Sequence, residues 1–395
     1  MNFLITLALS LAIIFLFTEL AYRLKVPIVL GQILGGVLIG IPLVKQWVVG
    51  GNISTIDMLA DLGIIFLLFL AGLGVSWNRM YGARKDIILI GLFGSVVPFA
   101  LGFIVMRLLG YDALLSLIVG VCLSITSEGT KARFLMEIKK LRTKVGATML
   151  GAGIIDDVIG LVMFITIASA LGHKVITTNL TYSPLELVGF IAILVLTFKL
   201  LPYIIRYEEK EVGEIREMSL FTTAILLCLV FAIFGMMITG TITGSIIAAF
   251  TAGIIIQLSL NKKEEMDIRK HFEIMALAFV IPFFFIGVGL NFDYTAFALD
   301  IPLLLAITSV AIVGKLLGVL MVKPFTHLNW KQLHLIGWGM NSRGAVELVI
   351  ALLALKAGLL TQQLYSAIVV MTLVTTVIFP FVLKYLIKRD PHIMG

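Results

Sequence analysis

Long apolar runs alternate along the chain with short charged or Pro/Gly-rich segments. Each run is close to the ~20 residues that a helix needs to cross a bilayer. The pattern therefore predicts an all-α integral membrane protein with about thirteen transmembrane helices. The predicted spans are Phe3–Ala21, Ile28–Val44, Ile56–Ser76, Ile87–Leu109, Leu114–Met136, Val145–Leu171, Leu185–Ile205, Leu220–Ile238, Thr241–Leu260, Ile274–Leu290, Pro302–Val322, Leu333–Ala354 and Leu364–Ile387.

Composition supports this class and sets the expected topology. Hydrophobic residues make up 60% of the 395 residues and charged residues only 13%, against about 25% charged residues in soluble domains. The net charge of +7 is expected to report cytoplasmic loops rather than nucleic-acid binding, because such loops are rich in Lys and Arg. The first cations, Arg23 and Lys25, follow the first run. We therefore expect a plasma-membrane protein with its N-terminus outside and its C-terminus in the cytoplasm.

Two adjacent carboxylates, Asp156 and Asp157, fall almost at the midpoint of the span Val145–Leu171. A charge at the bilayer centre costs about 2.5–3.5 kcal/mol on insertion scales. Packing gives no reason for that cost, so the pair predicts an ion or proton site. Neighbouring helix residues point about 100° apart, so one carboxylate can face a water-filled cavity while the other faces a neighbouring helix. Lys315, also near the middle of its span, is the expected partner of the second carboxylate.

Two other spans are interrupted at mid-depth by the polar runs Ser124–Lys131 (SITSEGTK) and Gly339–Glu347 (GMNSRGAVE). Irregular backbone is tolerated at this depth only where it is buried in protein or lines a cavity. Interrupted spans in corresponding halves of a chain point to a transporter site. The pattern predicts two inverted six-helix repeats with two crossing broken helices. Residues 1–171 form the first repeat, 172–217 a linker helix with loops, and 218–395 the second repeat.

Each break carries charges of its own. Broken helices leave free N–H and carbonyl groups, with partial charges of about half a unit at the helix ends. Glu128 is expected to compensate helix N-termini and Arg343 helix C-termini where the helices cross, or these two residues form a direct ion pair. Lys131 and Glu347 are open to the same two interpretations, compensation or pairing across the crossing.

Several runs resemble a known family. Arg23–Gly36 (RLKVPIVLGQILGG), Phe66–Leu73 (FLLFLAGL) and Phe284–Leu290 (FFIGVGL) are similar to recurring motifs of the second monovalent cation:proton antiporter family. The adjacent aspartates are the most specific match. Together with the lysine in the middle of its span, they resemble the charge-moving subgroup near the bacterial and archaeal sodium/proton antiporter branch.

The resemblance implies a role for each site residue. Asp157 would be the main cation and proton carboxylate, and Asp156 would form a switchable ion pair with Lys315. Thr126, with Ser127 near it, would supply oxygen close to the ion. Cation and protons would then compete for one site.

The resemblance also implies how the protein works as a whole. It would be a homodimeric secondary antiporter in the lipid bilayer that exchanges protons for Na⁺, with Li⁺ or K⁺ as other candidate cations, and the exchange would be electrogenic. A core around residues 87–171 and 274–354 would slide, as an elevator, against a dimerisation part made of the remaining helices. No cofactor is expected.

Other functions stay open at this point. Arg343 with Glu347 also resembles potassium/proton antiporters, and a sodium-coupled symporter of an organic solute can share crossing broken helices. A passive channel fits the paired carboxylates and matched breaks less well. An intramembrane aspartyl protease is remote, because that chemistry needs two aspartates that share a proton from facing helices. The chain lacks a phosphate-cradling Gly loop followed by Lys-Ser/Thr, which argues against a primary pump.

Overall fold

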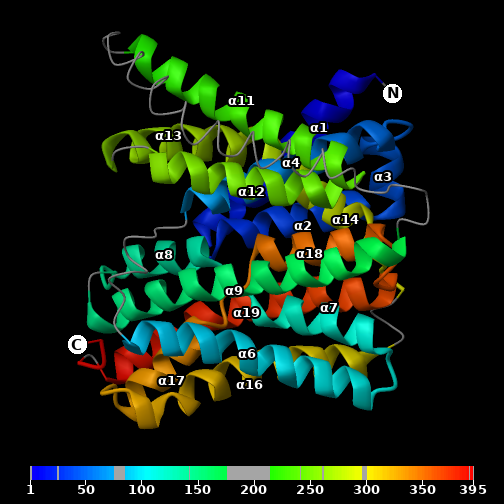
Figure 1. The fold of residues 1–395 in the computed structure, drawn as a ribbon. Helices are drawn as coiled ribbons and strands as arrows, with labels where there is room; N and C mark the ends of the chain where they lie inside the picture. Colours follow the sequence, from blue (N-terminus) through cyan, green and yellow to red (C-terminus); the bar gives the residue numbers. More distant parts are fainter. Residues whose placement is uncertain are drawn as a thin grey trace. The chain divides into compact units, whose positions relative to one another are not determined.

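The computed structural model is all-helical in the residues that it describes, and Figure 1 shows the helices. The described residues are 2–24, 26–74, 85–141, 143–175, 214–240, 242–259, 262–295, 300–390 and 392–394. They divide into two compact units. The first unit comprises residues 1–50, 77–167 and 288–395, and the second comprises 51–76 and 168–287.

The first unit holds both broken spans and the predicted site. Its helices are α1 (Phe3–Arg23), α2 (Ile28–Gly40), α3 (Pro42–Val48), α6 (Lys85–Leu108), α7 (Ala113–Ser124), α8 (Glu128–Glu137), most of α9 (Lys144–Val175), α16 (Ile301–Met321), a 3₁₀ turn (Lys323–Phe325), α17 (Trp330–Gly339), α18 (Ala345–Lys356) and α19 (Gln362–Arg389). Within it, α6 packs on α7 and α16, and α18 packs on α7 and α19.

The second unit is built around α4 (Ile53–Gly74), which packs on α12 (Ile242–Ser259). Its other helices are α11 (Glu214–Thr239), α13 (Lys262–Met275) and a π-helical turn (Ala276–Val280) that leads into α14 (Ile281–Leu290). The chain passes from the second unit to the first within α14.

Polar caps explain where several apolar helices begin. The side chain of Asp112 accepts from Leu115 N at the start of α7, and Asp300 accepts from Leu303 N at the start of α16. Asn329 forms a capping box at the start of α17. Such side chains satisfy backbone N–H groups that have no partner inside the helix, which matters most where apolar surroundings replace water.

Most predicted spans coincide with described helices, with two corrections. The run expected as the single span Ile28–Val44 is bent by 90° between α2 and α3, because Pro42 starts a new helix. The span expected over Ile274–Leu290 is part of a longer helical run, Asp267–Leu290, which is apolar enough to cross a bilayer and includes the π-helical turn. The expected span Leu185–Ile205 lies outside the described residues.

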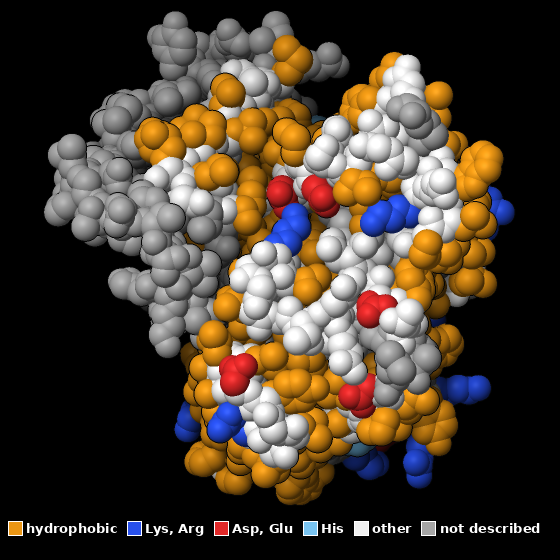
Figure 2. Space-filling view, turned by 90° about the vertical axis from the view of Figure 1, so that its right-hand side faces the viewer, with side chains coloured by type: hydrophobic (Ala, Val, Ile, Leu, Met, Phe, Trp, Pro, Cys, Tyr) orange, Lys and Arg blue, Asp and Glu red, His pale blue; other side chains and the backbone are white. Residues whose placement is uncertain are grey.

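The surface of the described part fits a membrane environment. Figure 2 shows hydrophobic side chains over much of the described face, with charged side chains at several places between them. Phe15, Trp47 and Leu108 are among the exposed hydrophobic residues of the described part. Six described helices are long and apolar enough to cross a bilayer, or seven if the bent pair α2 and α3 counts as one span. The multi-pass class is confirmed, while the count of thirteen and the inverted repeats stay predictions.

Candidate functional site

The two broken spans meet at their breaks, as the polar runs predicted. The amide of Ser127, between α7 and α8, donates to Ser342 O at 2.8 Å. The hydroxyl of Ser342, between α17 and α18, donates back to Ser127 O at 3.1 Å. A Cβ at Gly344 would lie only 2.6 Å from Ser127 Cβ, so glycine is needed for this approach. The interruptions of both helices are therefore confirmed, and each break holds the other.

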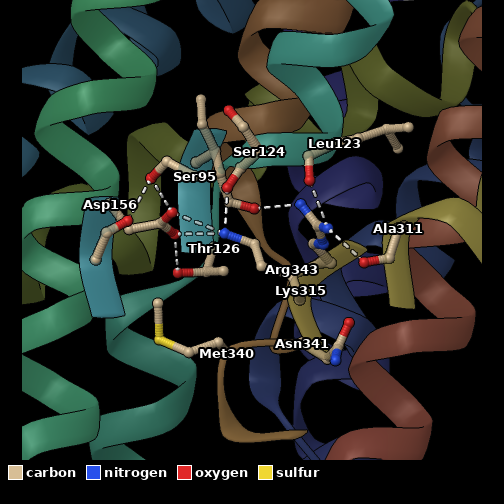
Figure 3. Close-up of polar contacts among 12 residues, drawn as sticks. Ser95, Leu123, Ser124, Thr126, Asp156, Ala311, Lys315, Met340, Asn341 and Arg343 are labelled. Carbon is tan, nitrogen blue, oxygen red and sulfur yellow. Dashed lines mark hydrogen bonds and ion pairs between the residues drawn. The ribbon is translucent and has the colours of Figure 1, made fainter. Parts of the chain in front are cut away.

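Asp156 of α9 lies beside this crossing and has no solvent exposure. Lys315 Nζ donates to its Oδ1 at 2.7 Å and its Oδ2 at 2.9 Å. The hydroxyl of Thr126 donates to Oδ2 at 2.7 Å, and the hydroxyl of Ser95 donates to Oδ1. Figure 3 shows these groups converging on the carboxylate. A carboxylate has about four acceptor positions, so Asp156 is fully occupied.

Lys315 reaches this depth because α16 packs closely on α6. A Cβ at Gly318 would lie 2.3 Å from Phe93 O, so only glycine permits this helix contact. The buried Nζ also donates to Ser124 O at the C-terminal end of α7, where helix carbonyls carry partial negative charge. The expected contact of Lys315 with one of the adjacent aspartates is confirmed, and its role as a switch stays a prediction.

Asp157 and Ser127 are placed differently from Asp156 and Thr126. Asp157 is only half-buried, whereas Asp156 is buried against Lys315 of a neighbouring helix. The two carboxylates therefore have different surroundings, as expected for adjacent residues on one helix. The assignment of Asp157 as the main cation carboxylate stays a prediction. The Ser127 hydroxyl shares a hydrogen bond of 2.9 Å with the Thr130 hydroxyl. The structure therefore brings Thr126, but not the Ser127 hydroxyl, to the Asp156 carboxylate.

Arg343 is completely buried in the second break, and its guanidinium bonds backbone carbonyls. Its Nη atoms donate to Leu123 O at 2.7 Å, to Cys122 O at 3.3 Å and to Ile125 O, all at the C-terminal end of α7, and to Ala311 O of α16 at 3.4 Å. A cation on the free carbonyls of a helix end offsets the helix dipole. This is the arrangement expected if Arg343 compensates a helix C-terminus at the crossing.

The other charged residues of the breaks have different neighbours. Glu347, in the first turn of α18, accepts from the amide of Gly344 and so caps its own helix. Lys131 of α8 is buried and donates to the Thr126 hydroxyl at 3.1 Å. Its suggested pairing with Glu347 stays a prediction. The side chain of Glu128 lies outside the described part, so its suggested pairing with Arg343 is also untested.

The sequence reasoning missed Ser95 as a member of this site. It is buried in the middle of α6, and its hydroxyl bonds both Gly91 O of its own helix and Asp156. A hydroxyl can satisfy itself on a backbone carbonyl four residues earlier, so a serine in an apolar helix gives little signal. The sequence feature that could have indicated Ser95 is the pair of small residues Gly94–Ser95, about one turn before Pro98 in an otherwise apolar run.

The described site has the chemistry of a hard-cation and proton site. Its oxygens are one carboxylate and two hydroxyls, with a second carboxylate on the next residue of α9. Oxygen ligands suit hard cations. The amine of Lys315 bonds both oxygens of the Asp156 carboxylate, so any other cation could reach this carboxylate only if the amine moved away.

Comparisons with known proteins agree with this interpretation. The family model described as "Sodium/hydrogen exchanger, transmembrane" matches residues 7–389. The chain is 34% identical over 382 residues to the Na(+)/H(+)-K(+) antiporter GerN of Bacillus cereus, covering 95% of each chain. It is 30% identical to a Na(+)/H(+) antiporter of Enterococcus hirae, covering 98% of this chain and 99% of the relative.

A solved structure shares the fold. The sodium proton antiporter MjNhaP1 of Methanocaldococcus jannaschii at pH 8 superposes with a TM-score of 0.70 at 18% identity, over 98% of both chains. At this identity the likeness concerns the fold alone. The family model and the two bacterial relatives each extend over nearly the whole sequence. The chain therefore belongs to the sodium/hydrogen exchanger family.

Proposed function

We propose that this protein exchanges protons for a monovalent cation across the cell membrane, with Na⁺ as the first candidate. The observation that carries the proposal is the buried Asp156–Lys315 ion pair beside two crossing broken helices. Intramembrane ionisable groups mark ion and proton pathways. The relatives named sodium/proton antiporters support the same exchange.

Competition at the two carboxylates provides the exchange. All four acceptor positions of Asp156 are taken, two of them by Lys315. A cation that binds there requires Lys315 to withdraw, and a lysine that loses a proton no longer holds the carboxylate as an ion pair. Asp157, half-buried on the same helix, takes the cation or a proton directly. Two protons then move for each monovalent cation, so the exchange carries net charge.

The movement that exposes the site to each side in turn is proposed as an elevator. The core, around residues 87–171 and 274–354, would slide against the remaining helices, which would also form the contact of a homodimer. The N-terminus would lie outside and the C-terminus in the cytoplasm. An unpaired charge in the bilayer costs free energy, so a core whose site holds neither cation nor proton would rarely move across the membrane. This would suppress uncoupled movement of either ion.

Potassium is the second candidate cation. GerN, the relative that is 34% identical, is named for both sodium and potassium, and Arg343 with Glu347 resembles potassium/proton antiporters. An intramembrane protease is less well supported, because Asp156 pairs with a lysine rather than with a second aspartate, and the relatives are transporters.

A proteoliposome assay tests the proposal. Vesicles that contain the purified protein and an internal pH dye are given an acid-inside gradient, then Na⁺, Li⁺, K⁺ or choline outside. We expect Na⁺ to dissipate the gradient, choline to leave it intact, and protein-free vesicles to show no response. Repeating the assay at clamped voltages tests the stoichiometry. One-for-one exchange that ignores voltage would exclude two protons per cation, and absence of any cation response would exclude antiport.

A further inference from the structure

The second break contains three buried polar atoms that have no hydrogen-bond partner among the described residues. They are Arg343 Nε, Asn341 Oδ1 and Glu347 Oε2. All three side chains are at most 1% exposed. Buried polar atoms are nearly always bonded to protein or to ordered water, so three in one short segment require an explanation.

The rest of each side chain is fixed, which leaves these three atoms available. The amide nitrogen of Asn341 donates to Gly337 O at 3.0 Å. The two terminal nitrogens of Arg343 are held by backbone carbonyls. One oxygen of Glu347 accepts from Gly344 N. In Figure 3 the oxygen of Asn341 is the end of the amide turned toward Arg343.

The three atoms match the bonding capacity of one water molecule. Arg343 Nε can only donate, whereas the amide oxygen of Asn341 and the carboxylate oxygen of Glu347 accept. A water accepts one hydrogen bond here and donates two, and buried waters typically make about three. A metal cation suits the two oxygens but not Arg343 Nε, which can only donate a hydrogen bond. We propose that the second break binds a water at these three atoms, and that this water makes Glu347 a proton-binding group separate from the two aspartates.

With this water in place, Glu347 can bind a proton while the second break stays buried. An added proton goes to Oε2 of the Glu347 carboxylate, which becomes a neutral acid, and the water turns so that it accepts from that oxygen. Loss of the proton reverses both changes. No bond other than O–H forms or breaks, and Gly344 N keeps its bond to the other oxygen throughout.

The charge of Glu347 acts on the exchange site through its neighbours. Arg343 of its own segment, Lys315 of α16 and Cys122 of α7 all interact electrostatically with it. From α19, which also packs on α18, the side chain that reaches this segment is Thr376, whose hydroxyl does not titrate and donates to Arg343 O at 3.1 Å. A change of charge at Glu347 therefore alters the potential at Lys315, which holds the site carboxylate.

Infrared spectroscopy of the purified protein tests the proton site without any transport assay. Difference spectra between neutral and acidic buffer should contain a buried carboxylic-acid band that shifts in D₂O. Glu347→Gln should lack this band. Asp112→Asn, which changes a helix-capping carboxylate at the other end of α7, should keep it. Identical difference spectra for Glu347→Gln and the unchanged protein would overturn the proposal.

Two further measurements test the water itself and provide an alternative variant if Glu347→Gln does not fold. An experimental structure that resolves waters should show one at the three atoms, and a direct Arg343–Glu347 bond in its place would overturn the proposal. If Glu347→Gln does not fold, Glu347→Asp keeps a carboxyl group one methylene shorter. The band should then move in frequency, and an unmoved band would again overturn the proposal.

A transport measurement follows, and it rests on the proposed antiport function. Glu347→Gln removes an anion, so neighbouring groups bind protons less tightly. The pH of half-maximal exchange should fall, by roughly one unit if the charge acts across ~10 Å at an effective dielectric of about 20. Asp112→Asn should leave the profile unchanged, and an unshifted Glu347→Gln profile would overturn the coupling. Absence of exchange in the unchanged protein would refute the antiport function while leaving the infrared result intact.

Discussion

Two lysine–aspartate pairs of the described part, one buried and one exposed, allow a comparative test of the site. Lys315 Nζ lies 2.7 Å from Asp156 Oδ1, and neither side chain is exposed. Lys331 Nζ lies 3.0 Å from Asp390 Oδ2, with the two side chains 74% and 32% exposed. We predict that Lys315→Gln destabilises the protein strongly, whereas Lys331→Gln has little effect.

The expected size follows from what remains around Asp156. Removing one partner of a buried ion pair costs about 3–5 kcal/mol, because the other charge is left uncompensated. The hydroxyls of Ser95 and Thr126 still donate to Asp156 in the variant, and a glutamine amide replaces one hydrogen bond. We therefore expect the lower end of the range, about 3 kcal/mol. Exposed pairs contribute little because water and salt screen them.

The assay is unfolding in detergent with and without Na⁺. In Lys315→Gln the position of the amine is available to a cation, so Na⁺ should recover stability that choline does not. At a concentration 100 times its Kd, a ligand contributes about 2.7 kcal/mol. Lys331→Gln should gain no more from Na⁺ than the unchanged protein does. Equal stability of the two variants, or equal gains from Na⁺, would refute the argument that Asp156 and Lys315 form a cation site.

Two further predictions concern neighbours of the Asp156–Lys315 pair, and a third concerns the exposed Lys331–Asp390 pair. Asp157→Asn should abolish cation-dependent proton movement in proteoliposomes while the protein still elutes as a folded species, and retained transport would remove Asp157 from the site. Gly344→Ala should slow exchange at least tenfold, because its Cβ would meet Ser127 at 2.5–2.6 Å, and adding Ser127→Gly should restore part of the rate; an unaffected single variant would argue against the crossing. The hydrogen bond from Lys331 lowers the pKa of Asp390, so this pair stabilises the folded chain above the ordinary aspartate value of about 3.9 and its contribution is lost as pH falls through the lower pKa. Asp390→Asn should therefore flatten the acid limb of the stability profile slightly, and an identical limb would contradict the pairing.

The sequence predicted the parts of the site that cost free energy in a membrane. Adjacent carboxylates, a mid-span lysine and two polar interruptions have no place in a lipid-facing helix, so each could be recognised without a structure. The contact between Lys315 and one of the aspartates follows from the same reasoning, because each buried charge needs a partner. The energetic reasoning alone left open which aspartate pairs, since that depends on the rotation of α9 about its axis, whereas the family resemblance implied Asp156.

The features that the sequence did not predict involve backbone groups, or polar residues that an apolar helix tolerates. The carbonyls that hold Arg343 carry no sequence signal. The Ser95 hydroxyl could have bonded Gly91 O of its own helix alone, so the sequence did not require a partner for it on another helix. The bend at Pro42 was missed because the apolar run Ile28–Val44 is continuous in composition, and hydropathy reports length rather than direction. The three buried atoms of the second break that lack a hydrogen-bond partner among the described residues likewise depend on side-chain geometry.

The end of α7 offers Lys315 a second partner that the proposed switch would need. Lys315 donates to Ser124 O as well as to Asp156, and Arg343 occupies the adjacent carbonyl of Leu123. A lysine that leaves Asp156 to a cation therefore keeps one hydrogen-bond acceptor and a partially negative helix end. Without that second partner, separation of the pair would incur the full penalty of two buried charges. The break in the first span thus supplies the alternative partner, and a continuous helix, whose carbonyls are all bonded internally, would not.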